Sequence, residues 1–227
     1  MDSQYQGFLI EVEGIAESTN NIIPAHRSAA VQGYSFSNRP FEEQLLIWDF
    51  IWNNGQSFWV RIHAFFFLER YMKKTEHHNT LWNTSIAWQE LVTDWSFCDS
   101  LAKINTRVLD TMPEEVYAVL QDWNTHPDLW KRRQSVVSLL YFSRTKKEYL
   151  PYRQIEVLVR KLLDDAEYYV QKGVGWTLRE MHTVYPVETM EFLKRNIAQV
   201  KPIAFTISIE KMSAIEKEVL KAGRKKS

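Results

Sequence analysis

The chain has 227 residues, of which 45% are hydrophobic and 14% aromatic, so it is long enough to bury a core. Its 28 basic and 28 acidic residues cancel, which excludes a molecule-wide positive field and leaves only local clusters of cations to bind nucleic acid. The single cysteine, Cys98, excludes an intramolecular disulfide, and neither an apolar run of membrane-spanning length nor an N-terminal signal sequence is found. We therefore expect a soluble, cytoplasmic protein that does not enter a membrane.

Apolar residues recur at helical spacing along almost the whole chain. Breaks rich in Gly, Asn and Pro separate the predicted helices, and connections this short place consecutive helices side by side. Only Phe205–Ile209 has an ambiguous, strand-like pattern. Residues 1–222 are expected to form a single domain, followed by a basic, flexible tail at 223–227. The predicted helices occupy residues 4–18, 25–32, 41–53, 57–73, 80–92, 97–110, 113–122, 128–143, 149–163, 166–183, 187–196 and 210–222.

One helical segment recurs three times with a cation shortly after an aromatic residue, ending at Arg61, Arg133 and Lys172. A fourth copy begins at Trp95 and has an acid, Asp99, in place of the cation. The copies are spaced by about 35 to 40 residues, a period typical of α-solenoids of the HEAT or armadillo kind. The sequence therefore predicts an all-α repeat protein.

The recurring cations predict a binding surface. In an α-solenoid the equivalent helices line one concave wall, so Arg61, Arg133 and Lys172 would form a row, with Arg132 and Arg179 close by. Cations interleaved with aromatic faces suit a polyanion whose sugars or bases contact the rings. The alternative is that these cations are ordinary solvated charges and the aromatic residues belong to the core.

The acid in the fourth copy is a candidate reactive group. Trp95 and Asp99 are one helical turn apart and share a face. A lone carboxylate can stabilise an oxocarbenium-like cation or orient a water, which suits the cleavage of an already weakened glycosidic bond. The alternative is that Asp99 caps a helix, although Asp94 offers an earlier cap. The histidines have no acid or cysteine at ligand spacing, so no metal and no cofactor is expected.

Three segments resemble a known family. They are Trp95-x-x-x-Asp99-Ser100-Leu101, then Asp122-Trp123 through Asp128-Leu129-Trp130-Lys131-Arg132-Arg133, and finally Tyr169-Val170-Gln171-Lys172-Gly173-Val174-Gly175-Trp176-Thr177-Leu178-Arg179-Glu180. In this order and spacing the chain resembles the AlkD-like DNA glycosylases, which are built of HEAT-like repeats and act on alkylated purines. The resemblance covers residues 45–200.

The resemblance implies a HEAT-like helical-repeat solenoid with a concave DNA-binding groove. It implies that Asp99 is the catalytic aspartate, that Trp95 and Trp176 lie beside the deoxyribose, that Arg133 holds the backbone at the lesion, and that Arg179 contacts a further phosphate. With Arg61, Arg132 and Lys172 as additional DNA contacts, the expected protein is a monomeric repair glycosylase. It would hydrolyse the N-glycosidic bond of cationic N3- or N7-alkylated purines in double-stranded DNA, as 3-methyladenine and 7-methylguanine glycosylases do.

The chain departs from the family near its N-terminal end, where Gly33 to Phe50 leaves room for one helix fewer than in the best-known members. This departure motivates an alternative function, a catalytically weak relative that binds distorted or branched DNA. A further alternative is a protein-interaction solenoid with incidental cations. Gly173 and Gly175 are expected to allow close approach, either of a neighbouring helix or of a DNA backbone.

Overall fold

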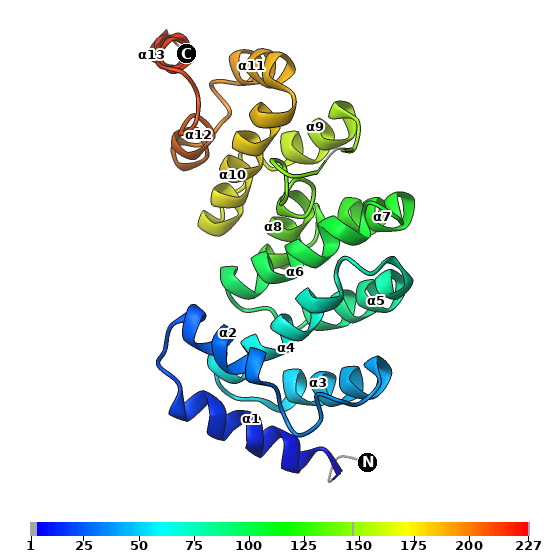
Figure 1. Ribbon diagram of the computed structural model, residues 1–227. Helices are drawn as coiled ribbons and strands as arrows, with labels where there is room; N and C mark the ends of the chain where they lie inside the picture. The colour runs from blue at the N-terminus through cyan, green and yellow to red at the C-terminus, as the bar shows by residue number, and fades with distance from the viewer. Residues whose placement is uncertain (1–3, 147, 227) are drawn as a thin grey trace. The chain divides into compact units, whose positions relative to one another are not determined.

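The computed structural model describes residues 4–146 and 148–226, and all the regular secondary structure within these ranges is helical (Figure 1). The prediction of an all-α fold is therefore confirmed. The chain divides into two compact units, Met1–Leu91 and Val92–Ser227, and the single domain expected over 1–222 stays a prediction. They are called here the N-terminal and the C-terminal unit. Within the described residues, no helix combines the length and the apolar character needed to cross a membrane.

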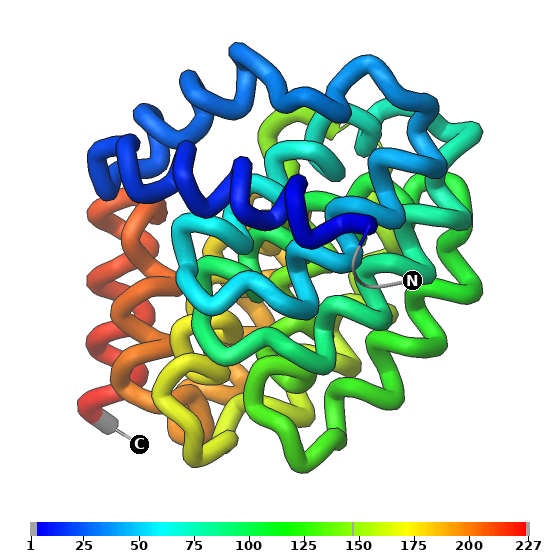
Figure 2. Tube along the Cα trace, turned by 90° about the horizontal axis from the view of Figure 1, so that it is seen from below, coloured from blue at the N-terminus to red at the C-terminus, as the bar shows by residue number. Residues whose placement is uncertain are grey.

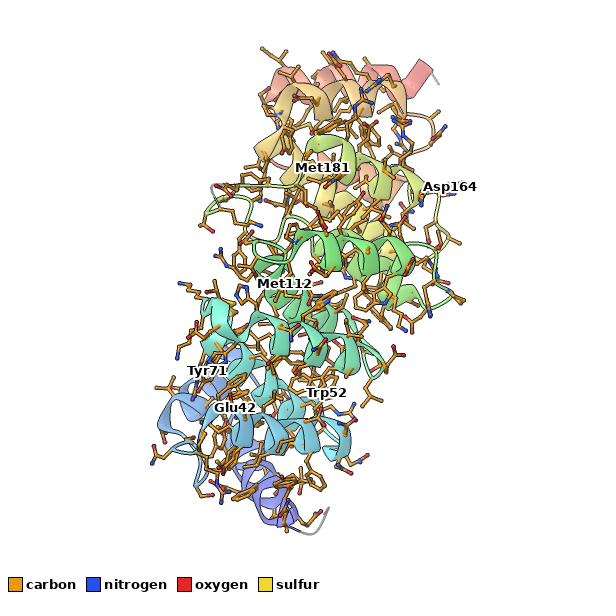
Figure 3. All side chains as sticks on the ribbon, turned by 90° about the vertical axis from the view of Figure 1, so that its right-hand side faces the viewer. Glu42, Trp52, Tyr71, Met112, Asp164 and Met181 are labelled. Carbon is orange, nitrogen blue, oxygen red and sulfur yellow. The ribbon has the colours of Figure 1, made fainter. Side chains whose placement is uncertain are left out.

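The N-terminal unit is built around a nearly continuous buried stretch of one helix, α4 (Phe58–Tyr71). The hydroxyl of Ser57 starts this helix by accepting a hydrogen bond from the backbone N–H of Val60. Helix α4 packs against neighbouring helices of this unit, and Trp52 from one of them is fully buried beside it (Figure 3). The other elements are α1 (Gln6–Ser18), α2 (Ile23–Gln32), α3 (Phe41–Asn54), a 3₁₀ turn (Thr75–His77) and α5 (His78–Gln89).

The C-terminal unit is organised around two helices, α8 (Leu129–Val137) and α10 (Tyr168–Val184), which pack against each other. Helix α8 also contacts α6, α7 and α9, whereas α10 also contacts α9, α11 and α12. The tube in Figure 2 follows the connections between these helices from green to red. The remaining helices are α6 (Trp95–Val108), α7 (Pro113–Trp123), α9 (Tyr152–Lys161), α11 (Pro186–Arg195), α12 (Pro202–Ser208) and α13 (Ala214–Lys226).

Three elements differ from their sequence prediction. The strand-like segment is helix α12, which begins with a proline in its first turn and buries Ala204, Phe205 and Ser208. The helix predicted over 128–143 ends at Val137 and is followed by turns. Residues 223–226, expected to be a flexible tail, continue α13; Arg224 anchors this end, because its guanidinium donates to the Val200 carbonyl (2.7 Å) and lies over the ring of Phe205.

Two glycines allow helices of the C-terminal unit to approach α10 closely. A Cβ atom on Gly175 would lie 2.7 Å from the carbonyl oxygen of Ala204 and 2.9 Å from Cβ of Ile207, both on α12. One on Gly173 would lie 3.2 Å from Cγ of Arg133 on α8. The close approach expected from the sequence is therefore that of neighbouring helices, and it draws α8 and α12 against the helix that carries Trp176.

Candidate functional site

Helix α6 presents the candidate catalytic acid. The carboxylate of Asp94 caps this helix by accepting hydrogen bonds from the backbone N–H groups of Ser96 (2.7 Å) and Phe97 (3.1 Å). Asp99 therefore lies beyond the cap, in the second turn, and its side chain is free to take part in a site. Trp95, one turn earlier on the same face, is 53% exposed, which is unusual for an indole in a chain whose other tryptophans are mostly buried.

Asp99 is held by an arginine from α8. Nη2 of Arg133 lies 2.8 Å and Nε 3.2 Å from Oδ1 of Asp99, and Nη1 donates to the carbonyl of Tyr169 on α10 (2.7 Å). The Arg133 side chain is only 7% exposed, against 26% for Asp99. Among the described residues none donates a hydrogen bond to Oδ2 of Asp99. One oxygen of the carboxylate is thus fixed by Arg133, and the other remains available to a ligand.

Different parts of the surroundings of Asp99 shift its pKa in opposite directions. Burial raises the pKa of Asp99 above its usual value, and this effect exceeds the opposing attraction of Arg133, Lys103 and Lys172. A carboxylate in such a position is poorly solvated by water. Its negative charge therefore interacts more strongly with a positive charge that develops beside it than the same group would in water.

Asp99 opens into a cavity of about 350 Å³ in the C-terminal unit, called here the Asp99 cavity. Its walls come from α6, α8, α10, α12 and the turn after α12. The cavity brings together all four residues predicted as catalytic, and two of the predicted DNA contacts also line it. The lining residues are Trp95, Asp99, Arg133, Tyr169, Lys172, Trp176, Arg179, Ile207 and Glu210.

The two DNA-contact candidates at the cavity differ in their surroundings. The ammonium of Lys172 lies 5.5 Å from the ring centroid of Tyr168 and makes no ion pair within the described part of the chain. Arg179 is bound on two sides: its Nε lies 2.9 Å from a buried carboxylate, Glu180, and its Nη1 lies 2.7 Å from the half-exposed carboxylate of Glu210. A DNA phosphate that bound Arg179 would have to compete with Glu210.

The other two predicted DNA contacts lie elsewhere. The Arg132 guanidinium lies 2.7 Å from the carboxylate of Asp165 and donates to the carbonyls of His126 and Pro127, so its donors fasten the loop before α8. Arg132 does not line the Asp99 cavity. Arg61 belongs to the N-terminal unit, where its guanidinium lies 5.2 Å from the ring of Trp52.

Three lining residues were not predicted. Tyr169 lies within the motif that contains Lys172, so its position three residues earlier was a usable signal. Ile207 and Glu210 come from α12 and the turn after it, a segment whose pattern is strand-like. Within the described residues, no group of three or more His, Cys, Asp or Glu side chains is arranged to hold a metal ion.

Comparisons with known proteins identify the family of the chain and show similar folds. A family model described as "DNA alkylation repair enzyme" matches residues 23–212. Two solved structures have similar folds. One is AlkD2 from Streptococcus mutans, with 17% sequence identity and a TM-score of 0.64, covering 92% of this chain and 100% of that one. The other is a protein from Enterococcus faecalis described as a predicted DNA alkylation repair enzyme, with 14% identity and a TM-score of 0.68, covering 85% of this chain and 87% of that one. A comparison with curated proteins gives no match.

Proposed function

The chain belongs to the DNA alkylation repair enzyme family, and we propose that within it the protein is a DNA glycosylase. Its substrates would be purines alkylated at N3 or N7, as in 3-methyladenine and 7-methylguanine, within double-stranded DNA. The observation that carries this proposal is the Asp99 cavity. It places Oδ2 of Asp99, which accepts no hydrogen bond from the described residues, among two tryptophans and several cations.

The reaction needs little from the protein because the substrate is already activated. An alkylated purine carries a positive charge, so the bond between C1′ and the base nitrogen breaks with its electron pair moving to the base. Positive charge then develops on the sugar, and a water adds at C1′ and loses a proton. The products are the free base and an abasic site.

Asp99 is suited to stabilise this transition state. Its Oδ2 would face the developing cation and either attract it directly or accept the proton of the attacking water. The ring faces of Trp95 and Trp176 would contact the same sugar, because the negative face of an indole attracts a cation. The cavity supports this arrangement because all three side chains line it.

The contacts of Arg133 favour a positioning role over the backbone contact that the family resemblance implied. Its guanidinium is nearly buried, and three of its nitrogens already bind Asp99 or Tyr169. We propose that Arg133 keeps the Asp99 carboxylate ionised and correctly oriented. Contact with the DNA phosphates would then be made first by Lys172 and Arg179, while Arg61 and Arg132 remain predicted DNA contacts.

A base-release assay tests the proposal. A duplex with a single 7-methylguanine is incubated with excess protein, and the free base and alkali-sensitive abasic sites are both measured. Release of the base with an equal yield of abasic sites is expected. If tight, salt-sensitive binding occurs without release, the protein is instead a member that recognises DNA structure. If no DNA binds at all, the protein-interaction alternative gains support.

A further inference from the structure

A second cavity adjoins the Asp99 cavity in the C-terminal unit and is not used by the proposed reaction. It has a volume of about 300 Å³ and shares two wall residues, Trp176 and Arg179, with the Asp99 cavity. It is called here the Arg144 cavity. Its other lining residues include Tyr141, Ser143, Arg144, Glu180 and Lys211. The two cavities are therefore neighbours that share the side chains of Trp176 and Arg179.

The charges around the Arg144 cavity favour an anion. Three cations line it, Arg144, Arg179 and Lys211, against a single carboxylate, Glu180. The Asp99 cavity also has three cations, but two carboxylates accompany them. Of the two cavities, the one without the catalytic acid is thus the more positive, as expected if it receives a phosphate rather than a cationic base.

Glu180 offsets only one of these three positive charges, and it also fixes the position of two of the cations. Its side chain is 5% exposed and accepts hydrogen bonds from Ser143, from Arg179 (2.9 Å) and from Lys211 (2.9 Å). Burial alone would raise the pKa of Glu180, but the hydrogen bonds from Ser143, Lys211 and Arg179 outweigh it and lower the pKa. The carboxylate therefore stays ionised and fixes two of the cations in the wall.

Arg144 lines the same cavity but takes no part in the hydrogen bonds of Glu180. It is exposed, and its guanidinium makes no hydrogen bond or ion pair with any described residue, in contrast to Arg132, Arg133 and Arg179. Beside it the rings of Tyr141 and Trp176 lie 5.5 Å apart at 38°, which provides an aromatic surface for a sugar or a base. A free guanidinium next to such a surface is suited to bind a nucleotide through its phosphate.

We propose that the Arg144 cavity binds the phosphodiester next to the damaged nucleotide in the same DNA strand, with Arg144 and Lys211 as the phosphate contacts. This proposal rests on the proposed function, because it takes the damaged nucleotide to lie in the Asp99 cavity. Since Trp176 lines both cavities, one strand can pass from the sugar at Asp99 to the phosphate at Arg144.

The test compares Arg144→Ala with a matched variant, Arg153→Ala. Arg153 is on α9, its side chain is 87% exposed, and it lines neither cavity. The dissociation constant of a duplex with one 7-methylguanine is measured by fluorescence anisotropy at several salt concentrations. Loss of one phosphate contact should reduce the slope of log Kd against log salt by about 0.9 in Arg144→Ala. The slope of Arg153→Ala should equal that of wild type.

Uncharged phosphate analogues in the DNA then show which phosphate Arg144 contacts. Replacing individual phosphates near the lesion with methylphosphonates should weaken wild-type binding most at the phosphate next to the lesion, and Arg144→Ala should be insensitive to that one replacement. An unchanged salt slope in Arg144→Ala, or equal sensitivity of both proteins at every phosphate, would overturn the proposal. Base release by wild type is a separate readout. If the base is not released but Arg144→Ala shows the expected slope, the glycosylase proposal fails and the phosphate site stands.

Discussion

Replacing Arg133 by glutamine separates a positioning role from a role in holding DNA. Two hydrogen bonds from Arg133 to Oδ1 of Asp99 favour the ionised carboxylate, and a hydrogen bond to a charged group contributes about 1.5–3 kcal/mol. Both bonds go to the same oxygen and Asp99 is partly exposed to solvent, so we apply the lower figure, about 1.5 kcal/mol, to the pair as a whole. One pKa unit corresponds to about 1.4 kcal/mol. The pKa of Asp99, already raised by burial, should therefore rise by about one further unit in Arg133→Gln.

The sign of the effect on activity follows from the role of Asp99. The reaction needs the carboxylate, so activity is lost as the pH falls through the pKa of Asp99. A higher pKa makes that loss occur at a higher pH. Single-turnover release of 7-methylguanine, measured across pH, should show the acidic limb displaced upward by about one pH unit in Arg133→Gln.

A neighbouring arginine provides the control. Arg132→Gln also removes an arginine–carboxylate pair from α8, but its partner is Asp165, so the acidic limb should stay in place. An unmoved limb in Arg133→Gln, together with a reduced salt slope for DNA binding, would refute the positioning role. It would show instead that Arg133 contacts a phosphate.

Three further predictions concern other parts of the chain. Glu210→Gln removes the exposed partner of Arg179 and should tighten DNA binding about two- to fivefold, as measured by anisotropy; unchanged affinity would take Arg179 out of the interface. Burial lowers the pKa of His63 to about 4, below the 6.5 of the unfolded chain, so the free energy of unfolding should fall by about 2–3 kcal/mol between pH 7 and 4.5. Urea titrations should show a smaller fall in His63→Phe; an equal fall would contradict this. Gly175→Ala should lower the stability by about 1–3 kcal/mol because its Cβ meets the backbone of α12, whereas Gly223→Ala, where the space is open, should not lower it; thermal melts compare the two.

Local sequence patterns were sufficient for most of the fold. Helix α6 was expected over 97–110 from its apolar spacing, and Asp94 was recognised as a possible cap. The helix begins at Trp95, directly after that cap, and this earlier start places Asp99 in the second turn. Trp176 was placed near them only by the resemblance of its motif to a family. The repeat spacing predicted that Arg133 and Lys172 would lie in one row, whereas Tyr169, Ile207 and Glu210 were not predicted as part of the Asp99 cavity.

Long-range pairing could not be predicted in the same way. Arg132 and Arg133 are adjacent in the sequence, yet the first binds Asp165 and the second binds Asp99. Which carboxylate each meets depends on how α8 is rotated against α6 and α10, and the close approach at Gly173 contributes to that packing. Sequence spacing places a residue on a helix face but does not identify its partner from another helix.

The short helix α12 was missed for a physical reason. Its seven residues, Pro202–Ser208, are too few to show a helical period, and β-branched residues give it a strand-like composition. It is helical because it packs on α10 at Gly175. Because this helix was not predicted, Ile207 and Glu210 were not recognised as residues of the Asp99 cavity. The competition between Glu210 and DNA for Arg179 was therefore not predicted either.

The central claim is that Asp99 makes this protein a glycosylase. The most direct measurement is single-turnover release of 7-methylguanine from a methylated duplex by wild type, Asp99→Asn and a control, Asp122→Asn. We predict release by wild type and by the control, and a rate about 10²- to 10³-fold lower for Asp99→Asn with unchanged DNA affinity. Equal rates for wild type and Asp99→Asn would contradict the account, and so would the absence of release by wild type.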